Sequence, residues 1–355
     1  MTACVGPIEL KRRYWQCRCG ADGSYAVDDL LRLDGHFTRT LQKHICRLTA
    51  DCSFAASSEH IKELLHVGVC PETVRGLSER HGKAMFEFQS KDEMTPEAFK
   101  KASGEVEFTT DAGKVNTREE GWKDLKIGVI QKRESGESML PADWDKQRLP
   151  MPTIHLAFAE IAKSKRFRRN WSKTVRRLGV MQFGEVHVLA DGASWIWKSV
   201  NRVLSGCVQT LDIYHGCEYL SKGAAAIFGE HTEEAKTSFE KGRSLLLSKG
   251  WVGVCEWVGE CLAVEEPKEQ ERRRTITEKV IVYFSKHVGR LNYAERLAEG
   301  RAIGSGVVEG KAKTLGLRLK ARGARWNLGN VRPMASLVCV RHSVQWNAYW
   351  VSLIA

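Results

Sequence analysis

The sequence predicts a mixed α/β fold, and three features of its 355 residues support this prediction. Alternating or β-branched runs, typical of strands, recur between residues 104 and 212. Helical patterns separate the later runs from one another, and longer helical stretches precede and follow them. Two strands, a helix, a strand, a helix and a strand in this order are typical of a mixed sheet with helices packed on it.

Residues 1–100 are expected to form a mostly helical N-terminal region after a strand-like start at residues 9–17. The segment SSEHIKELLHVGVCPETVRGLSERHGKAM predicts two helices around a tight turn, with Pro71 where the second helix begins. Such a pair is typical of a DNA-reading helix-turn-helix, and equally of plain helical packing. Cys17 and Cys19 form the closest cysteine pair, but their one-residue spacing does not favour zinc.

Residues 101–228 are expected to form the first part of the α/β core. GEVEFTTD at 104–111 and GWKDLKIGVIQ at 121–131 predict a hairpin, because polar turn residues separate two strand-like runs. EVHVLAD at 185–191 and VQTLD at 208–212 predict two further strands.

A helix starting near Trp195 is expected between those two later strands. The resulting order fits an RNase H-like layout, which requires one more strand. Residues 132–153 supply that strand poorly, and the stretch from there to residue 185 is interpreted as helical and basic.

Residues 229–300 are expected to be an all-helical, charged insertion, in which EEPKEQERRRTITEK is interpreted as a solvated loop leading into a helix. Residues 301–355 are expected to complete the core. There the GSG at 304–306 opens a helix of about four turns that closes near Gly323. A last helix, rich in Trp and Val, follows.

The charge balance indicates a polyanionic partner. Lys and Arg number 55 against 43 Asp and Glu, which gives a formal net charge of +12 and favours nucleic acid. No run approaches the roughly 18 apolar residues of a membrane span, and the start lacks the apolar core of a signal peptide, so the expected location is the cytoplasm and no membrane partner is expected. The odd number of cysteines, 11, argues against a disulfide framework.

Two aspartates at predicted strand ends are the first candidate metal ligands. Asp111 ends the first predicted strand and Asp191 the third, and in an RNase H-like sheet these strands are neighbours about 4.8 Å apart. Carboxylate oxygens are the ligands that Mg²⁺ prefers, and two ions roughly 4 Å apart can clamp both oxygens of a phosphodiester displacement. A single Asp at a strand end is more often a turn or cap residue, so this prediction rests on the combination.

Glu309 is the candidate third acid. On the helix opened by GSG it shares one stripe with Lys313, Gly316 and Lys320, at spacings of four, three and four. The adjacent stripe is apolar and consists of Val308, Ala312, Leu315 and Leu319. The helix is therefore expected to pack on the sheet while it presents one acid to the metal ions and two lysines to DNA phosphate.

A competing cluster lies in LDIYHGCEYL, where Asp212, His215 and Glu218 recur at steps of three. Asp212 is expected roughly 10 Å from Asp111, across two strand spacings, which is far for a shared ion. These three residues are therefore expected to support the site, with His215 orienting the ligands or contacting a DNA phosphate.

Two basic segments are expected to line a channel for DNA. Residues 163–177 contain eight Lys/Arg and no acid, and the chain from residue 301 has nine Lys/Arg against Glu309 alone. Basic runs are also found as plain solvated faces. The residues expected to contact DNA, with the tryptophan stacking on unpaired bases, are Arg166, Arg168, Arg169, Lys173, Lys313, Lys320, Arg322, Arg325 and Trp326.

Five segments carry a family resemblance: TTDAGKVNTREEGWKDLKIGVI, VLADGASWIWKSV, LDIYHGCEYL, IGSGVVEGKAK and RLKARGARW. In this order they resemble bacterial insertion-sequence transposases of the ISKra group, which are related to the Mutator-like DDE enzymes with an RNase H fold. The similarity runs from about residue 10 to the end. It implies a catalytic core with a helical insertion between the second and third acids. Such transposases usually have more chain upstream, often with Cys pairs.

In that pattern Asp111, Asp191 and Glu309 occupy the DDE positions, and Asp212 and His215 match an accompanying D-x-x-H signature. The resemblance implies a transposase that binds the terminal inverted repeats of its element and uses Mg²⁺, or Mn²⁺ in its place, to cleave DNA and join it to target DNA. A homo-oligomer at the bacterial nucleoid is expected, because two ends must be held together. Two alternatives stay open: a catalytically idle, transposase-derived DNA-binding protein, and a stand-alone RNase H-like nuclease or resolvase.

Overall fold

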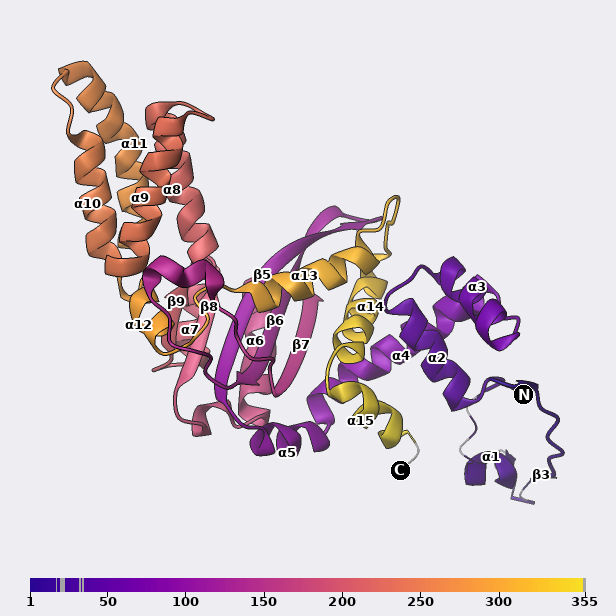
Figure 1. The fold of residues 1–355 in the computed structure, drawn as a ribbon. Helices are drawn as coiled ribbons and strands as arrows, with labels where there is room; N and C mark the ends of the chain where they lie inside the picture. Colours follow the sequence, from indigo (N-terminus) through magenta and orange to yellow (C-terminus); the bar gives the residue numbers. More distant parts are fainter. Residues whose placement is uncertain (17, 20–22, 32, 34, 354–355) are drawn as a thin grey trace.

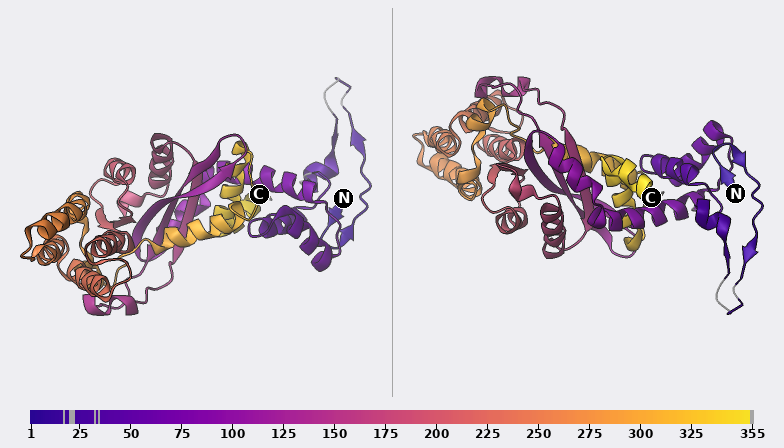
Figure 2. Two further views of the ribbon diagram at one scale, coloured as in Figure 1. Left: turned by 90° about the horizontal axis from the view of Figure 1, so that it is seen from above. Right: turned by 90° about the horizontal axis from the view of Figure 1, so that it is seen from below.

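The computed structural model describes residues 1–16, 18–19, 23–31, 33 and 35–353. A twisted sheet lies in the middle of the molecule, with a group of long helices at one end and the N-terminal helices at the other (Figure 1). The views from above and below show the same elongated order (Figure 2). The predicted mixed α/β class is confirmed.

The sheet has five strands in the order β7-β6-β5-β8-β9. Their bounds are Glu105–Thr117 for β5, Gly121–Arg133 for β6, Ile154–Ile161 for β7, Val186–Ala190 for β8 and Val208–Leu211 for β9. Antiparallel pairing joins β5 to β6 and β6 to β7, whereas β5, β8 and β9 are parallel. The predicted hairpin and the two later strands are confirmed.

The interpretation of the segment before residue 185 as helical is wrong at β7. Its sequence, IHLAFAEI, contains the good helix formers Leu, Ala and Glu, and it lacks a polar alternation because both of its faces are covered. Ala157 and Ala159 pack in the core on one face of the sheet, and Ile154 and Leu156 in the core on the other. A strand buried on both faces cannot be told from a buried helix by periodicity.

Helices α6 (Ser164–Arg177) and α7 (Ser194–Val203) cover one face of the sheet. There Trp171 of α6 meets Phe108 of β5 edge to face, with ring centroids 4.7 Å apart. The other face is covered by α13 (Gly306–Leu319) and α14 (Leu328–Arg341).

The apolar stripe predicted on α13 is buried at Val308, Leu315 and Leu319. The helix ends at Leu319, four residues before the predicted Gly323, which lies in the following loop with φ +78°.

The N-terminal region contains α2 (Arg39–Thr49), α3 (Phe54–Leu65) and α4 (Pro71–Lys91), and α4 begins at Pro71 as predicted. The first half of α4 packs with α2 and α3, and its second half packs on α14. Gly82 permits this contact, because a Cβ there would lie 2.2 Å from the carbonyl oxygen of Pro333.

The remaining N- and C-terminal elements are β1 (Thr2–Ala3), β2 (Gly6–Pro7), β3 (Tyr14–Trp15), β4 (Ser24–Tyr25), α1 (Ala26–Leu31), α5 (Met94–Lys101) and α15 (Gln345–Ser352). Short 3₁₀ helices span Pro141–Lys146, Val180–Gln182 and Val288–Arg290. Cys17 of the predicted cysteine pair lies outside the described residues.

Between β9 and α13 the chain forms a helical unit with its own core. Its helices are α8 (Ile213–Phe228), α9 (Glu233–Lys249), α10 (Trp251–Leu262), α11 (Pro267–Ser285) and α12 (Tyr293–Ala298). This unit is the group of long helices on the left of Figure 1.

The interpretation of EEPKEQERRRTITEK as a solvated loop leading into a helix places the start of the helix too late. The helix α11 already begins at Pro267, so most of this segment is helical. Glu266 caps this helix and Glu269 pairs with Arg272 and Arg273 along it, so the charges stabilise a helix rather than a loop. Across the described part of the chain, no helix has both the length and the apolar character needed to cross a bilayer.

Candidate carboxylate site and basic surfaces

Asp111 and Asp191 lie side by side at one edge of the parallel strand pair. Thr110 and Ala190 are the last paired residues of β5 and β8, and each aspartate follows directly. β8 ends there, but β5 does not end at Asp111 as predicted. It continues to Thr117, because β6 goes on satisfying its backbone groups beyond the point where β8 stops.

Each of the two carboxylates has one oxygen bound to a nearby backbone N–H. Asp111 accepts from the N–H of Ala112 at 2.6 Å, and Asp191 from that of Ala193 at 2.8 Å, just before α7 begins. Both side chains are half-buried. Among the described residues, no donor meets the second oxygen of either carboxylate, so both can take a further ligand.

The electrostatics of the pair favour a cation. Burial raises the pKa of Asp111 above its ordinary value, the N–H of Ala112 lowers it, and the charge of Asp191 raises it again. His215 acts in the opposite direction and lowers this pKa, which places its imidazole within electrostatic reach of Asp111. A positive ion between the two carboxylates would offset the cost of burying their charges and reduce the repulsion between them.

Tyr283 of α11 stands beside this pair, and the sequence patterns did not single it out. A Cβ on Gly192 would lie 2.6 Å from the Tyr283 hydroxyl oxygen, so the residue after Asp191 must be small. Tyr283 stacks on Tyr219 with ring centroids 3.5 Å apart. Burial raises the pKa of Tyr283, and the charge of Asp191 contributes. The helical unit therefore forms one wall of the carboxylate site.

Asp212 is buried and its carboxylate is fully used by the fold. One oxygen caps α8 by accepting from the N–H groups of Tyr214 and His215, at 2.7 and 3.1 Å. The other accepts from the N–H of Ser305 at 2.5 Å and from the Ser305 hydroxyl. Glu218 is exposed and pairs with Lys222 at 3.4 Å.

Glu309 lies in the first turn of α13, and the structure does not bring it into contact with the two aspartates. Its side chain is 57% exposed and pairs with Lys313 at 2.9 Å. Within the described ranges, no group of three or more His, Cys, Asp or Glu side chains is placed to hold a metal ion. Asp111 and Asp191 alone therefore form the metal-binding candidate, and their oxygens fit a hard cation such as Mg²⁺.

The basic face of α6 is exposed, as its charge pattern predicts. Arg169 and Lys173 are exposed, and Arg168 is half-buried. Arg166 is exposed too, but it pairs at 2.7 Å with Glu160, a buried carboxylate on β7. Among the predicted contacts on this helix, Arg169 and Lys173 are therefore the exposed cations for which the described residues provide no ion pair.

The second basic group follows α13. Lys320 lies over the β5–β6 hairpin, where its Nζ would be 3.8 Å from a Cβ on Gly113. Arg322 and Arg325 are exposed in the next loop. Exposed positive charge on this loop suits contact with a polyanion.

Trp326 is buried instead of being presented to solvent, with 8% of its surface exposed. Its indole N–H donates to the carbonyl of Leu319 at 3.0 Å, and its ring lies 6.0 Å from that of Phe54. A bridge between Trp326 and Thr117 ties the loop to the hairpin. A base cannot stack on this ring while it is packed in this way.

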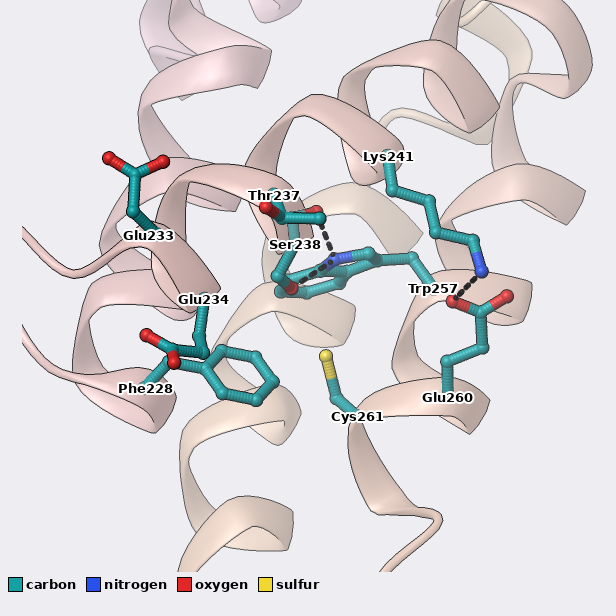
Figure 3. Close-up of a pocket in the computed structure, with 9 residues that line it drawn as sticks. All are labelled: Phe228, Glu233, Glu234, Thr237, Ser238, Lys241, Trp257, Glu260 and Cys261. Atoms are coloured by element: carbon teal, nitrogen blue, oxygen red, sulfur yellow. Dashed lines mark hydrogen bonds and ion pairs between the residues drawn. The ribbon is translucent and has the colours of Figure 1, made fainter.

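An open pocket of about 500 Å³ lies among α8, α9 and α10, in the helical unit (Figure 3). Several of its polar groups bind one another: the Trp257 indole N–H donates to the Ser238 carbonyl at 2.9 Å, and Lys241 pairs with Glu260 at 2.8 Å. Cys261 faces the pocket beside Trp257 (Figure 3). All of its lining residues lie in the helical unit, and neither of the two candidate aspartates is among them.

Comparison with known proteins assigns no family: no protein-family model matches the chain, and no curated protein matches it. The chemistry of the site is therefore inferred from its own residues. These are two adjacent carboxylates at a sheet edge, with exposed basic residues on α6 and after α13.

Proposed function

We propose that this chain is a DNA transposase that binds element ends and carries out metal-dependent strand cleavage and strand transfer. The observation that carries the proposal is the position of Asp111 and Asp191, directly after paired residues of adjacent parallel strands. The strand order β7-β6-β5-β8-β9, with β6 antiparallel to its neighbours, supports an RNase H-like core.

Asp111 and Asp191 would hold Mg²⁺, or Mn²⁺ in its place. Bound divalent ions supply charge neutralisation at the scissile phosphate and activate the attacking oxygen. Phosphoryl transfer requires little covalent work from the protein, so the role of the chain is to position the DNA and the two carboxylates. The N–H groups of Ala112 and Ala193 fix one oxygen of each aspartate and leave the other to face the DNA.

Glu309 would join the site only after its pair with Lys313 opens. Both side chains are largely exposed, and an exposed ion pair is worth at most about 1 kcal/mol. A DNA phosphate that attracts Lys313 would therefore release Glu309 at little cost. Arg169 and Lys173 on α6, with Arg325 after α13, would hold the DNA, and two copies of the chain would hold two element ends.

The decisive experiment incubates the full chain with labelled duplex DNA from the ends of its own element and with Mg²⁺ or Mn²⁺. Nicked and joined products are expected with the wild type and not with Asp191→Asn. Asp124→Asn is the matched control, because Asp124 lies on β6, in the same sheet as the two candidate aspartates, but pairs with Lys114 at 2.7 Å. An unchanged cleavage rate in Asp191→Asn would reject the proposal, and nicking without joining would indicate a stand-alone nuclease or resolvase.

The separation of Glu309 from the aspartates favours one alternative, a catalytically idle DNA-binding protein derived from a transposase. Titration with Mg²⁺ distinguishes the two. The idle protein would bind DNA equally well with and without the ion and would never nick it, whereas the enzyme would nick DNA only when the ion is present.

A further inference from the structure

A second pocket, of about 470 Å³, lies where the N-terminal helices meet the core. It is lined by the start of α3, the first half of α4, the turn between β5 and β6, the end of α13, the loop that leads into α14 and the start of α14. Figure 1 shows the tip of the β5–β6 hairpin beside that loop. Three arginines, Arg118, Arg318 and Arg325, come together here from distant parts of the sequence.

Arg318 is a buried cation without a carboxylate partner. It is 5% exposed, and among the described residues no acid forms an ion pair with it. Its Nε donates to the carbonyl of Thr49 at 2.6 Å, whereas its Nη2 is buried without a hydrogen-bond partner. Burial lowers the pKa of Arg318 to about 10, so the guanidinium still carries its charge at neutral pH.

Two aromatic rings hold Arg318 in place. Its guanidinium carbon lies 4.6 Å from the ring centroid of Phe54 and 4.9 Å from that of Trp326. These contacts stabilise the cation but supply no negative charge. A buried, uncompensated charge costs several kcal/mol, which is a reason to expect an anionic ligand.

The entrance of the pocket is positive as well. Arg118 and Arg325 are exposed, and no described residue forms an ion pair with either. Arg75 and Glu79 of α4 also line the pocket, but their charges neutralise each other in an ion pair of 2.8 Å, and Arg75 pairs with Glu72 as well. Two helices begin at the pocket, α3 after its cap Ser53 and α14 after Asn327, so their positive ends lie near it. The first N–H group of α14, that of Leu328, already donates to Glu119 at 2.8 Å, and the Ser53 hydroxyl accepts from the N–H of Ala56.

We propose that this pocket binds a phosphate group, with Arg318 at its base and Arg118 and Arg325 at its rim. The planar donor fork of arginine matches the oxygens of a phosphate, and the N-terminal ends of α3 and α14 add positive potential. The source of the phosphate rests on the proposed function, under which it is a backbone phosphate of DNA. Trp326 then serves DNA binding indirectly, by holding Arg318, and not by stacking on a base.

The first test measures thermal unfolding in sodium phosphate and in sodium chloride at equal ionic strength. The pocket variant is Arg118→Gln/Arg325→Gln, whose two side chains are exposed and can change without loss of folding. The control is Lys268→Gln/Arg274→Gln on α11, which removes the same charge from exposed positions far from the pocket. Phosphate also stabilises folded proteins by exclusion from their surface, so the difference between proteins is the relevant quantity.

Phosphate is expected to raise the melting temperature of the wild type and of the control by more than chloride does. In the pocket variant this additional rise is expected to be smaller than in the other two proteins, because only the general effect of exclusion remains. An additional rise of the same size in all three proteins, or in none of them, would overturn the proposal.

The second test measures binding of a labelled DNA duplex in EDTA at several salt concentrations. The pocket variant is expected to bind roughly tenfold more weakly than the control, with the slope of log K against log salt reduced by about 1 for the lost phosphate contact. If phosphate loses its effect but DNA binding does not, the site takes a free phosphate compound and the DNA source is rejected. EDTA removes divalent ions, so this test measures DNA binding without strand cleavage. Its result therefore does not depend on whether the chain is catalytically active.

Discussion

The carboxylate of Asp212 accepts hydrogen bonds from both the backbone N–H and the hydroxyl of Ser305, 93 residues further along the chain. Its other oxygen caps α8. The chain leaves the sheet for the helical unit at α8 and returns at α13, just after Ser305. The buried side chain of Asp212 therefore holds together the two points at which the chain leaves the sheet and comes back to it. It also helps to position α13, the helix that carries Glu309.

We predict that Asp212→Ala lowers the free energy of unfolding by roughly 2–4 kcal/mol, because it leaves several N–H groups unpaired. Ser305→Ala should cost about 1 kcal/mol. The double variant should cost less than the sum, since the two residues share a contact. Urea unfolding measures these values, with Asp145→Ala, which is exposed, as the control. Additive losses would show that the two side chains are not coupled.

Asp111→Asn should stabilise the protein at neutral pH in the absence of divalent ions. The pKa of Asp111 is raised in the folded state, chiefly by burial, so this carboxyl contributes stability below its unfolded pKa and loses that contribution as pH rises through the folded pKa. Melting temperatures at pH 7 and pH 4 test the sign, because the advantage of the variant should shrink at the lower pH. Added Mg²⁺ should stabilise the wild type more than the variant; equal effects would argue against an ion at this residue.

His187 should titrate far below an ordinary histidine. Burial and, to a smaller extent, the charge of Arg296, whose Nη1 lies 3.0 Å from the ring, together lower its pKa to about 4. The carboxylate of Glu105 lies 3.2 Å from Nε2, but Arg301 pairs with that carboxylate and contacts the ring as well, so the surroundings favour neutral imidazole.

A lowered histidine pKa adds stability above the unfolded value of about 6.5, and this stability, on the order of 3 kcal/mol, is lost as pH falls towards 4. An NMR titration of the His187 ring protons measures the pKa directly. A midpoint near 6.5 would contradict the buried, neutral state.

Two glycines on α10 should respond to alanine in opposite ways. A Cβ on Gly253 would lie 2.0 Å from the carbonyl oxygen of Leu245, whereas a Cβ on Gly259 would meet open space. Gly259→Ala should therefore add roughly 0.5–1 kcal/mol through helix propensity. Gly253→Ala should destabilise the protein by about 1–3 kcal/mol through overpacking. Thermal unfolding of both variants decides, and stabilisation by Gly253→Ala would disprove the close contact.

Trp326→Ala and Arg322→Gln should separate stability from DNA binding. Removing the buried Trp326 ring should cost about 3–5 kcal/mol. Arg322 is exposed, so Arg322→Gln should leave the unfolding midpoint unchanged and weaken DNA binding. Denaturant unfolding and DNA affinity are measured for both variants. Trp326→Ala should lose stability, whereas Arg322→Gln should lose only affinity for DNA. An unchanged unfolding midpoint in Trp326→Ala would contradict the buried position of this ring.

Local patterns predicted most of the sheet. The polar turn between two strand-like runs indicated β5 and β6, and Pro71 marked the first residue of α4. β7 was missed because its two faces are both covered, which removes the alternation that identifies an exposed strand. The start of α11 was missed because ion pairs along a helix and charges in a solvated loop have the same composition.

Only the part of the candidate site that lies on adjacent strands could be predicted from the sequence. Asp111 and Asp191 follow paired residues of neighbouring strands, a relation that strand order alone implies. Tyr283 reaches Asp191 from a helix 92 residues further on, and no local signal in the sequence indicates this contact. The burial of Arg318, near the end of α13, depends on the rings of Phe54 in α3 and Trp326 in the loop before α14. The sequence of α13 alone does not indicate these contacts, because both rings come from other elements.

The packing of α14 on β7 and α4 has a consequence for the order in which the protein matures on the ribosome. The strands β5, β6 and β7 are synthesised long before residues 328–341, which cover one of their faces. At roughly 5–20 residues per second, the apolar side chains of Leu125, Ile127 and Val129 wait on the order of ten seconds or more for their cover. A nascent chain of this protein therefore exposes one apolar face of its sheet until α14 has been synthesised.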